Sequence, residues 1–158
     1  MNGRGVLVAA VCLYLAGALQ PLAPRFGFWG MRPDFLLAAL GPLSLLATRR
    51  GGLLLGFAAG VLGGALPGAN MAHYVISRTV GGAFGAWVRS LGFEDGPAVS
   101  AATAFALTIV AQLVLMFLAP PARIGAFLGA TIGSAVLNGL LAIPLFALLT
   151  RIVDPVKR

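Results

Sequence analysis

The chain has 158 residues, of which 59% are hydrophobic and only 9% are charged, and its mean hydropathy is +0.98. A soluble domain contains about 25% charged residues, so a chain with four acidic residues in all cannot be a water-soluble globule. The net charge of +7 does not indicate a nucleic-acid partner, because the basic residues lie between apolar stretches, where they anchor membrane spans, and form no run interleaved with aromatic residues. The one cysteine, Cys12, excludes a disulfide framework.

Long apolar stretches predict the secondary structure. A spanning helix needs about 20 apolar residues, and five stretches have no charged residue: 5–24, 35–48, 51–77, 96–122 and 124–150. The third stretch is too long for one span and continues past Arg78, so it is expected to contain two. We therefore predict an all-α membrane protein with a single domain, residues 1–158, and six spans at about 5–22, 33–48, 51–67, 69–88, 98–118 and 124–150.

The first two spans raise separate questions. Arg4 and the small residues 16–18 resemble a cleavable signal, but a multi-span protein normally keeps its first span, and we interpret it as retained. Span 2 follows an aromatic loop and opens on Pro33 and Asp34, both suited to a helix start. Residues 33–48 would extend only about 24 Å, so this span could begin earlier, near Phe28, or thin the bilayer, or be re-entrant.

The other connections are short. A tight turn is expected at Pro67-Gly68, a hydrophilic connection at 89–97, and a helix end at Pro120-Pro121. The last span is long enough to tilt and contains Pro144 as a kink. Because the longest connection has about ten residues, any function must lie in the helix bundle or on its faces.

The basic residues predict the orientation. With six crossings, one side of the membrane receives Arg4, Arg49, Arg50, Arg89, Arg151, Lys157 and Arg158, and the other side receives Arg25, Arg32 and Arg123. Cytoplasmic loops carry the excess of Lys and Arg. Seven against three places both termini in the cytoplasm, in a multi-pass membrane protein.

Glycine recurs every four residues in two spans. The first stripe contains Gly52, Gly56, Gly60, Gly64 and Gly68, and the second contains Gly125, Gly129 and Gly133. This spacing places small residues on one helix face, where two backbones can approach closely. The stripes favour packing inside the bundle, and the alternative is that one of them faces a partner protein.

Polar residues at membrane depth form the second signal. In span 4, Asn70, His73 and Ser77 share a face, with Arg78 about 100° further round, and span 6 repeats the spacing at Thr131, Ser134 and Asn138. A buried ionisable group usually faces the bundle interior or a wet cavity. Three roles are therefore open for Arg78: a structural one, in which an internal ion pair would have to recruit Asp34 from a helix end; binding of a lipid or ligand together with His73; or contact with a partner protein.

The same residues argue against an enzyme. Hydrolysis within the membrane needs an activated nucleophile with a base, or a set of metal ligands. One histidine, one cysteine and no acidic residue in mid-span do not supply either set. We expect no cofactor, no metal and no catalytic residue, and we interpret His73 as a polar residue near a helix start.

The chain resembles the MreD family of bacterial rod shape-determining membrane proteins. The resemblance is carried by Arg32-Pro33-Asp34 at the start of span 2, Arg49-Arg50, the Gly56-Phe57 pair with Gly60, and Asn138-Gly139 followed by Pro144 and Arg151. It covers nearly the whole chain. One departure is that many MreD proteins carry an aspartate near the end of the third helix, where this chain has Gly63-Gly64, so that Arg78 would lack the partner expected from the family.

The resemblance implies a non-enzymatic scaffold of the cell-elongation complex. Such a protein binds MreC and acts with MreB, RodA and a class B penicillin-binding protein during lateral wall synthesis. The candidate interaction or packing residues are Arg32, Pro33, Asp34, Gly56, Phe57, Gly60, Gly64, His73, Arg78 and Asn138.

Two other functions remain open. The substrate-binding component of an energy-coupling-factor vitamin transporter has a similar size and six-helix plan, and would use His73, Arg78 and Asn138 to hold a small molecule. Such components often carry an Ala-x-x-x-Ala pair in the first span, and none occurs here. A small lipid-handling protein is the third candidate, based on Arg78 and the outer basic residues.

Overall fold

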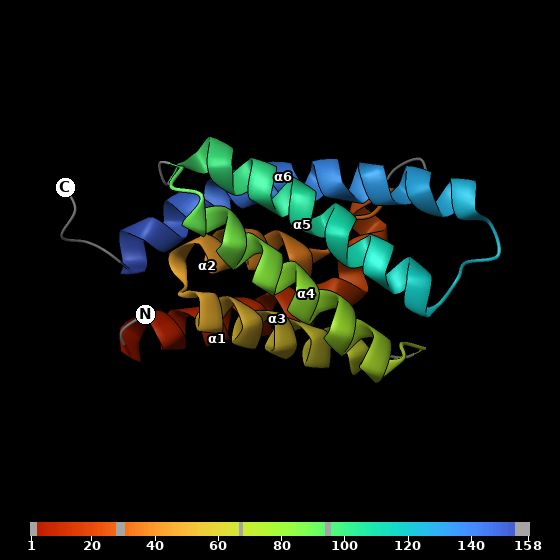
Figure 1. Cartoon of the computed structure of the whole chain (residues 1–158), viewed down its shortest axis with the longest axis horizontal. Coiled ribbons are helices and arrows are strands. Elements are labelled where there is room, and N and C mark those ends of the chain that lie inside the picture. The colour runs from red at the N-terminus through yellow and green to blue at the C-terminus, as the bar shows by residue number, and fades with distance from the viewer. Residues whose placement is uncertain (1–2, 28–30, 67, 94–95, 154–158) are drawn as a thin grey trace.

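The protein is a single bundle of helices (Figure 1). The computed structural model describes residues 3–27, 31–66, 68–93 and 96–153. In chain order the elements are α1 (Gly3–Leu19), the 3-10 helix η1 (Gln20–Phe26), α2 (Phe35–Leu46), α3 (Arg49–Gly64), α4 (Met71–Ser90), α5 (Pro97–Leu118) and α6 (Ile124–Val153). The prediction of an all-helical chain is confirmed.

Three helical segments are long and apolar enough to cross a membrane: Gly3–Phe26, Pro97–Leu118 and Ile124–Val153. They are the segments expected as spans 1, 5 and 6. The other helices fall where spans were expected, although α2 and α3 have only 12 and 16 residues. The structure therefore supports a membrane protein, whereas the count of six full crossings stays a prediction.

Polar side chains define where three helices begin. Asp34, Thr48 and Asn70 each precede a helix and accept a hydrogen bond from the backbone N–H three residues further on, at donor–acceptor distances of 3.1, 3.2 and 3.4 Å. These caps satisfy amides that have no partner within their own helix. Because of these caps, α3 begins at Arg49 rather than at residue 51, and α4 begins at Met71 rather than at residue 69.

The turn between α3 and α4 includes Gly68, whose φ of 80° lies in the left-handed region that glycine adopts without strain. Pro67, expected in this turn, lies outside the described residues. The loop aromatics Phe28 and Trp29, and the acidic residues Glu94, Asp95 and Asp154, also lie outside them.

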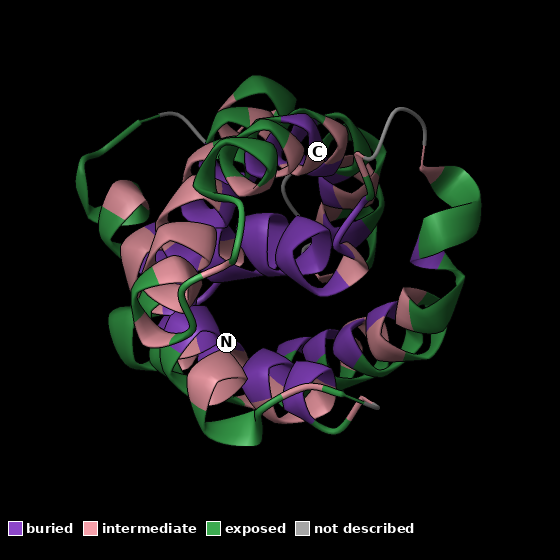
Figure 2. Ribbon diagram, turned by 90° about the vertical axis from the view of Figure 1, so that its right-hand side faces the viewer, coloured by how far each residue is buried: buried purple, intermediate pink, exposed green. Residues whose placement is uncertain are grey.

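Helix α2 occupies the centre of the bundle. Every residue from Leu36 to Leu45 is buried, and the end-on view in Figure 2 shows exposed residues on the outside of the molecule and buried ones within. The expectation of one helix over 33–48 is wrong in extent, because the Asp34 cap starts the helix at Phe35. Twelve residues extend only about 18 Å, which is less than the roughly 30 Å of the hydrocarbon core, so a full crossing here would also need the non-helical residues before the helix.

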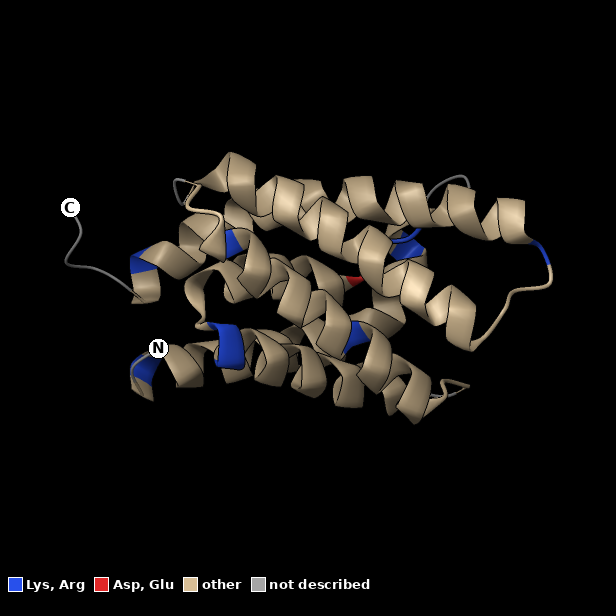
Figure 3. Cartoon of the chain, in the orientation of Figure 1, with Lys and Arg blue, Asp and Glu red and all other residues tan. Residues whose placement is uncertain are grey.

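The first turn of α1 and the last turn of α6 lie at the same end of the bundle (Figure 1). An even number of crossings requires this arrangement. Most of the basic residues in Figure 3 also lie near the ends of the bundle rather than along its middle. Which end faces the cytoplasm stays a prediction from the count of arginine and lysine.

Candidate functional site: a buried polar cluster and a glycine interface

Asp34 and Arg78 form an ion pair inside the bundle. The Nη2 atom of Arg78 donates to Oδ2 of Asp34, and the two side chains are 2% and 10% exposed. The guanidinium also lies over the ring of Tyr74, with Cζ 4.9 Å from the ring centroid, which allows a cation–π interaction. Of the alternatives open for Arg78, the structure shows the structural one, because Asp34 at the start of α2 pairs with it in place of the aspartate that this chain lacks at Gly63-Gly64.

Further hydrogen bonds connect this pair, which joins α2 and α4, to α5 and α6. The backbone N–H of Asp34 donates to Oδ1 of Asn138 on α6 at 2.9 Å, and Nδ2 of Asn138 donates to Oγ1 of Thr108 on α5 at 3.1 Å. Beside the pair, Nη1 of Arg78 donates to the hydroxyl of Ser77 at 3.1 Å, and this hydroxyl donates to the carbonyl of Ala111 at 2.6 Å. We call Asp34, Ser77, Arg78, Thr108 and Asn138 the polar cluster.

The chain enters α2 through residues 31–34, which are not helical. Non-helical backbone within a membrane is tolerated only where protein groups satisfy its hydrogen bonds. The carbonyl of Arg32 accepts from the hydroxyl of Ser134, Pro33 has no N–H to satisfy, and the N–H of Phe35 donates to Oε1 of Gln20 at 2.9 Å. The Arg-Pro-Asp sequence is thus suited to an unwound entry into the core.

Four glycines of the first stripe lie in the interface between α3 and α4, and the fifth, Gly68, lies in the turn that follows. A Cβ atom added to Gly60 would lie 2.5 Å from Cα of Val75, and one added to Gly64 would lie 2.6 Å from Cα of Met71. A Cβ at Gly52 or Gly56 would also meet α4. The stripe therefore brings two helix backbones into contact within the bundle, which is the packing role described for small residues in membranes.

The second stripe has two different environments. A Cβ atom at Gly125 or Gly129 would meet nothing within 4 Å, whereas one at Gly133 would meet the side chain of Met31. Only the part of the stripe near the middle of α6 packs against the described chain. The first two turns of α6 present an open face.

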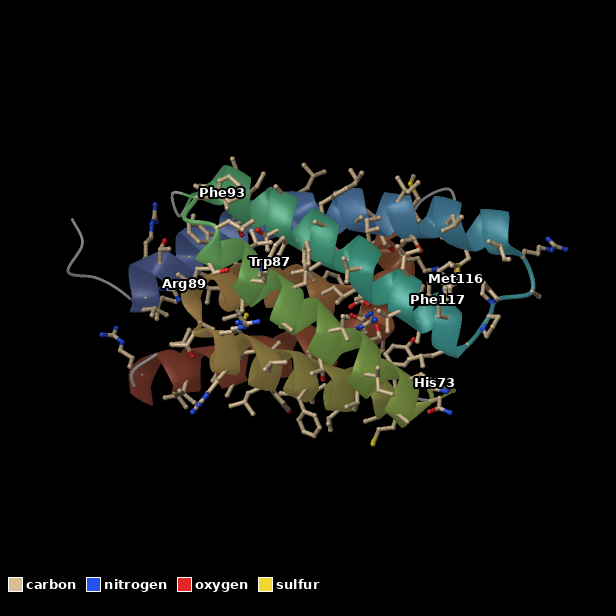
Figure 4. All side chains as sticks on the ribbon, in the orientation of Figure 1. His73, Trp87, Arg89, Phe93, Met116 and Phe117 are labelled. Atoms are coloured by element: carbon tan, nitrogen blue, oxygen red, sulfur yellow. The ribbon has the colours of Figure 1, made fainter. Side chains whose placement is uncertain are left out.

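The structure brings together only some of the candidate residues. Asp34, Arg78 and Asn138 meet in the polar cluster, and the buried Pro33 lies beside them in the chain. The side chain of Phe57 is 52% exposed. His73 lies in the first turn of α4, near the end of the bundle opposite the first turn of α1 (Figure 4).

The polar row expected on span 4 does not share one environment. Asn70 is exposed and caps the helix, His73 is half-buried, and Ser77 is buried against α5. The row on span 6 does face inward, because Ser134 and Asn138 bond to the entry segment and Thr131 is buried.

Sequence reasoning did not single out Thr108 and did not assign Gln20 a bonding role. Gln20 is a polar residue inside a charge-free stretch, which is a usable signal for an internal hydrogen bond. Thr108 gives no such signal, because its hydroxyl also donates to the carbonyl of Ala104 at 2.6 Å, a bond that any helical threonine can make.

Three buried polar atoms have no hydrogen-bond partner in the described chain: Nε of Arg78, Oγ1 of Thr79 and Oγ1 of Thr103. Among the described residues, no three histidine, cysteine or acidic side chains are grouped to hold a metal ion. The polar cluster offers one carboxylate, already paired with a guanidinium. This arrangement is suited to holding helices together.

No protein-family model matches the chain, and neither a curated protein nor a solved structure is significantly similar to it.

Proposed function

We propose that the chain is a non-enzymatic membrane scaffold of the MreD type. It acts in the cytoplasmic membrane of a bacterium, in the complex that synthesises the lateral wall, and it binds MreC. MreB, RodA and a class B penicillin-binding protein belong to the same complex. In this function the interior of the bundle supplies a rigid shape, and the outer helix faces supply the contacts with lipid and with other membrane proteins.

The observation that supports this proposal most strongly is that the side chains of the polar cluster bond to one another inside the bundle. Arg78 and Asn138 both bond to Asp34, one through the carboxylate and one through the backbone N–H. Meanwhile the outer surface presents large apolar side chains from several helices, including Leu7, Tyr14, Ile132 and Leu140. A protein that binds other membrane proteins needs such a surface and a bundle that keeps its shape.

The alternative is the substrate-binding component of a vitamin transporter. This function would need His73, Arg78 and Asn138 to face a common ligand. The hydrogen-bonding capacity of Asn138 is directed at Asp34 and Thr108, and His73 lies about 7 Å along the helix axis from Arg78 because five residues separate them. The scaffold proposal accounts for these bonds without a ligand.

Purification of the tagged chain from its native membrane in a mild detergent tests the proposal. Mass spectrometry would then identify the proteins that are recovered with it, and an untagged strain processed in parallel gives the background. We expect MreC or wall-synthesis proteins. Recovery of ATPase subunits with a coupling membrane protein would overturn the scaffold proposal and favour the transporter.

A further inference from the structure

A groove of about 410 Å³ lies on the outer surface of α3, α4 and α5. Its lining residues are Arg49, Leu53, Val80, Ala83, Phe84, Trp87 and Val110. All of them are apolar except Arg49, and Trp87 and Val80 are 47% and 40% exposed, so the groove is open to the surroundings of the bundle. Figure 4 shows Trp87 on α4, towards the end of the bundle that contains the first turn of α1.

One end of the groove is positively charged. Arg49 is the first residue of α3, where the unpaired amides of the helix end add a partial positive charge. Arg50 follows it on the same turn. Asp34 is the one acidic residue that the structure describes, and it is paired with Arg78 in the core, so no carboxylate of the described chain neutralises Arg49.

The apolar wall leads away from this charge. The α4 residues of the groove run from Trp87 back to Val80, a distance of about 10 Å along the helix axis. Tryptophan is enriched at the headgroup level of membranes, and basic residues near the cytoplasmic surface attract anionic lipids. The groove therefore has a cationic mouth at headgroup level and an apolar trough directed towards the middle of the bilayer.

We propose that this groove binds one anionic phospholipid. Its phosphate pairs with the guanidinium of Arg49, and one acyl chain lies along Val80, Ala83, Phe84 and Trp87. Charge complementarity identifies this occupant, because the groove offers one cation at its mouth and no other polar side chain along its length. A partner helix, about 10–12 Å across with its side chains, is thicker than an acyl chain. The proposal does not depend on the scaffold function.

Two variants one residue apart test the role of charge. Native mass spectrometry of the full chain in detergent would measure binding of phosphatidylglycerol and of phosphatidylcholine to the wild type, Arg49→Gln and Arg50→Gln. Because one arginine near anionic lipid contributes about 1 kcal/mol, Arg49→Gln should weaken phosphatidylglycerol binding about five-fold. Arg50→Gln, which removes the same charge outside the groove lining, should change it less than about two-fold. Equal effects of the two substitutions, or equal binding of the two lipids, would overturn the proposal.

A third variant tests the trough without changing charge. Ala83→Phe fills the groove beside Phe84 and should abolish the preference for phosphatidylglycerol, while the chain elutes as the wild type does in size-exclusion chromatography. If this variant does not fold, the comparison of Arg49→Gln with Arg50→Gln tests the proposal by itself. Both arginines are exposed, so replacing them should not disturb folding.

The identity of the occupant is tested in native membranes. A photoreactive amino acid in place of Val80 should form an adduct with phospholipid on illumination. An adduct with another polypeptide would show that a protein occupies the groove, and would overturn the lipid proposal while leaving the scaffold proposal intact.

Discussion

Asp34 combines three structural roles in one residue. Its side chain caps α2 and pairs with Arg78, and its backbone N–H bonds to Asn138. Removing one partner of a buried ion pair costs about 3–5 kcal/mol, whereas replacing both by neutral groups of similar volume is often close to neutral. The pair therefore fixes the position of α2 against α4 without being required for stability as such.

The variants of this pair should show that asymmetry. Asp34→Asn retains a capping side chain but leaves the buried guanidinium uncompensated, so it should lower the free energy of unfolding by about 3–5 kcal/mol. The double variant Asp34→Asn with Arg78→Met should recover most of this loss. Thermal and denaturant unfolding in detergent would measure both, and an unaffected single variant would contradict the burial of the pair.

Two threonines of α5 provide a matched comparison. Thr108 both accepts and donates a hydrogen bond, whereas the buried hydroxyl of Thr103 has no partner in the described chain. Thr108→Val should cost about 1–3 kcal/mol because it leaves buried groups unsatisfied, and Thr103→Val should be neutral or stabilising. Unfolding of both variants under the same conditions checks this difference, and equal losses would speak against the hydrogen-bond assignment.

At the scale of the helices, the α3–α4 pair depends on glycine. The backbones are so close at Gly60 that any Cβ would collide with Val75, and the contact extends over about three turns, from Gly52 through Gly56 to Gly64. Close backbone approach of this kind replaces the hydrophobic driving force that helices lack inside lipid.

Gly60→Leu should force α3 and α4 apart and reduce the yield of folded protein. Overpacking usually costs about 1–3 kcal/mol, and here the obstacle is backbone that cannot rotate away. The control is Gly129→Leu on the open face of α6, where nothing lies within 4 Å of an added Cβ. Expression and thermal unfolding of the two variants would measure the contrast, and a Gly60→Leu protein that folds and unfolds like the wild type would contradict it.

The sequence predicts most of the helices but little of how they meet. Charge-free stretches and the positions of prolines place the six helices to within a few residues. The central and fully buried position of α2 was not predicted, because it depends on all the surrounding helices. The pairing of Asp34 with Arg78 joins residues 44 positions apart, which no local pattern identifies. The four-residue spacing of glycine indicates a close contact, but nothing in the spacing identifies α4 as the neighbour of α3.

At the scale of the whole molecule, charge sets the orientation. Seven basic residues fall on the side predicted to be cytoplasmic and three on the other. The first turn of α1 and the last turn of α6 also lie at the same end of the bundle. Reporter fusions to the amino and carboxyl ends should both be active in the cytoplasm. Activity of the two reporters on opposite sides would show an odd number of crossings and contradict the predicted topology.

The central claim is that the polar cluster holds the bundle together while the outer faces bind the partners. The most direct test is to repeat the native-membrane purification with the Asp34→Asn, Arg78→Met double variant, after its unfolding shows that it is folded. We predict that it recovers the same membrane partners as the wild type, in similar amounts. A folded double variant that loses those partners would show that the cluster itself takes part in recognition, and would contradict the account.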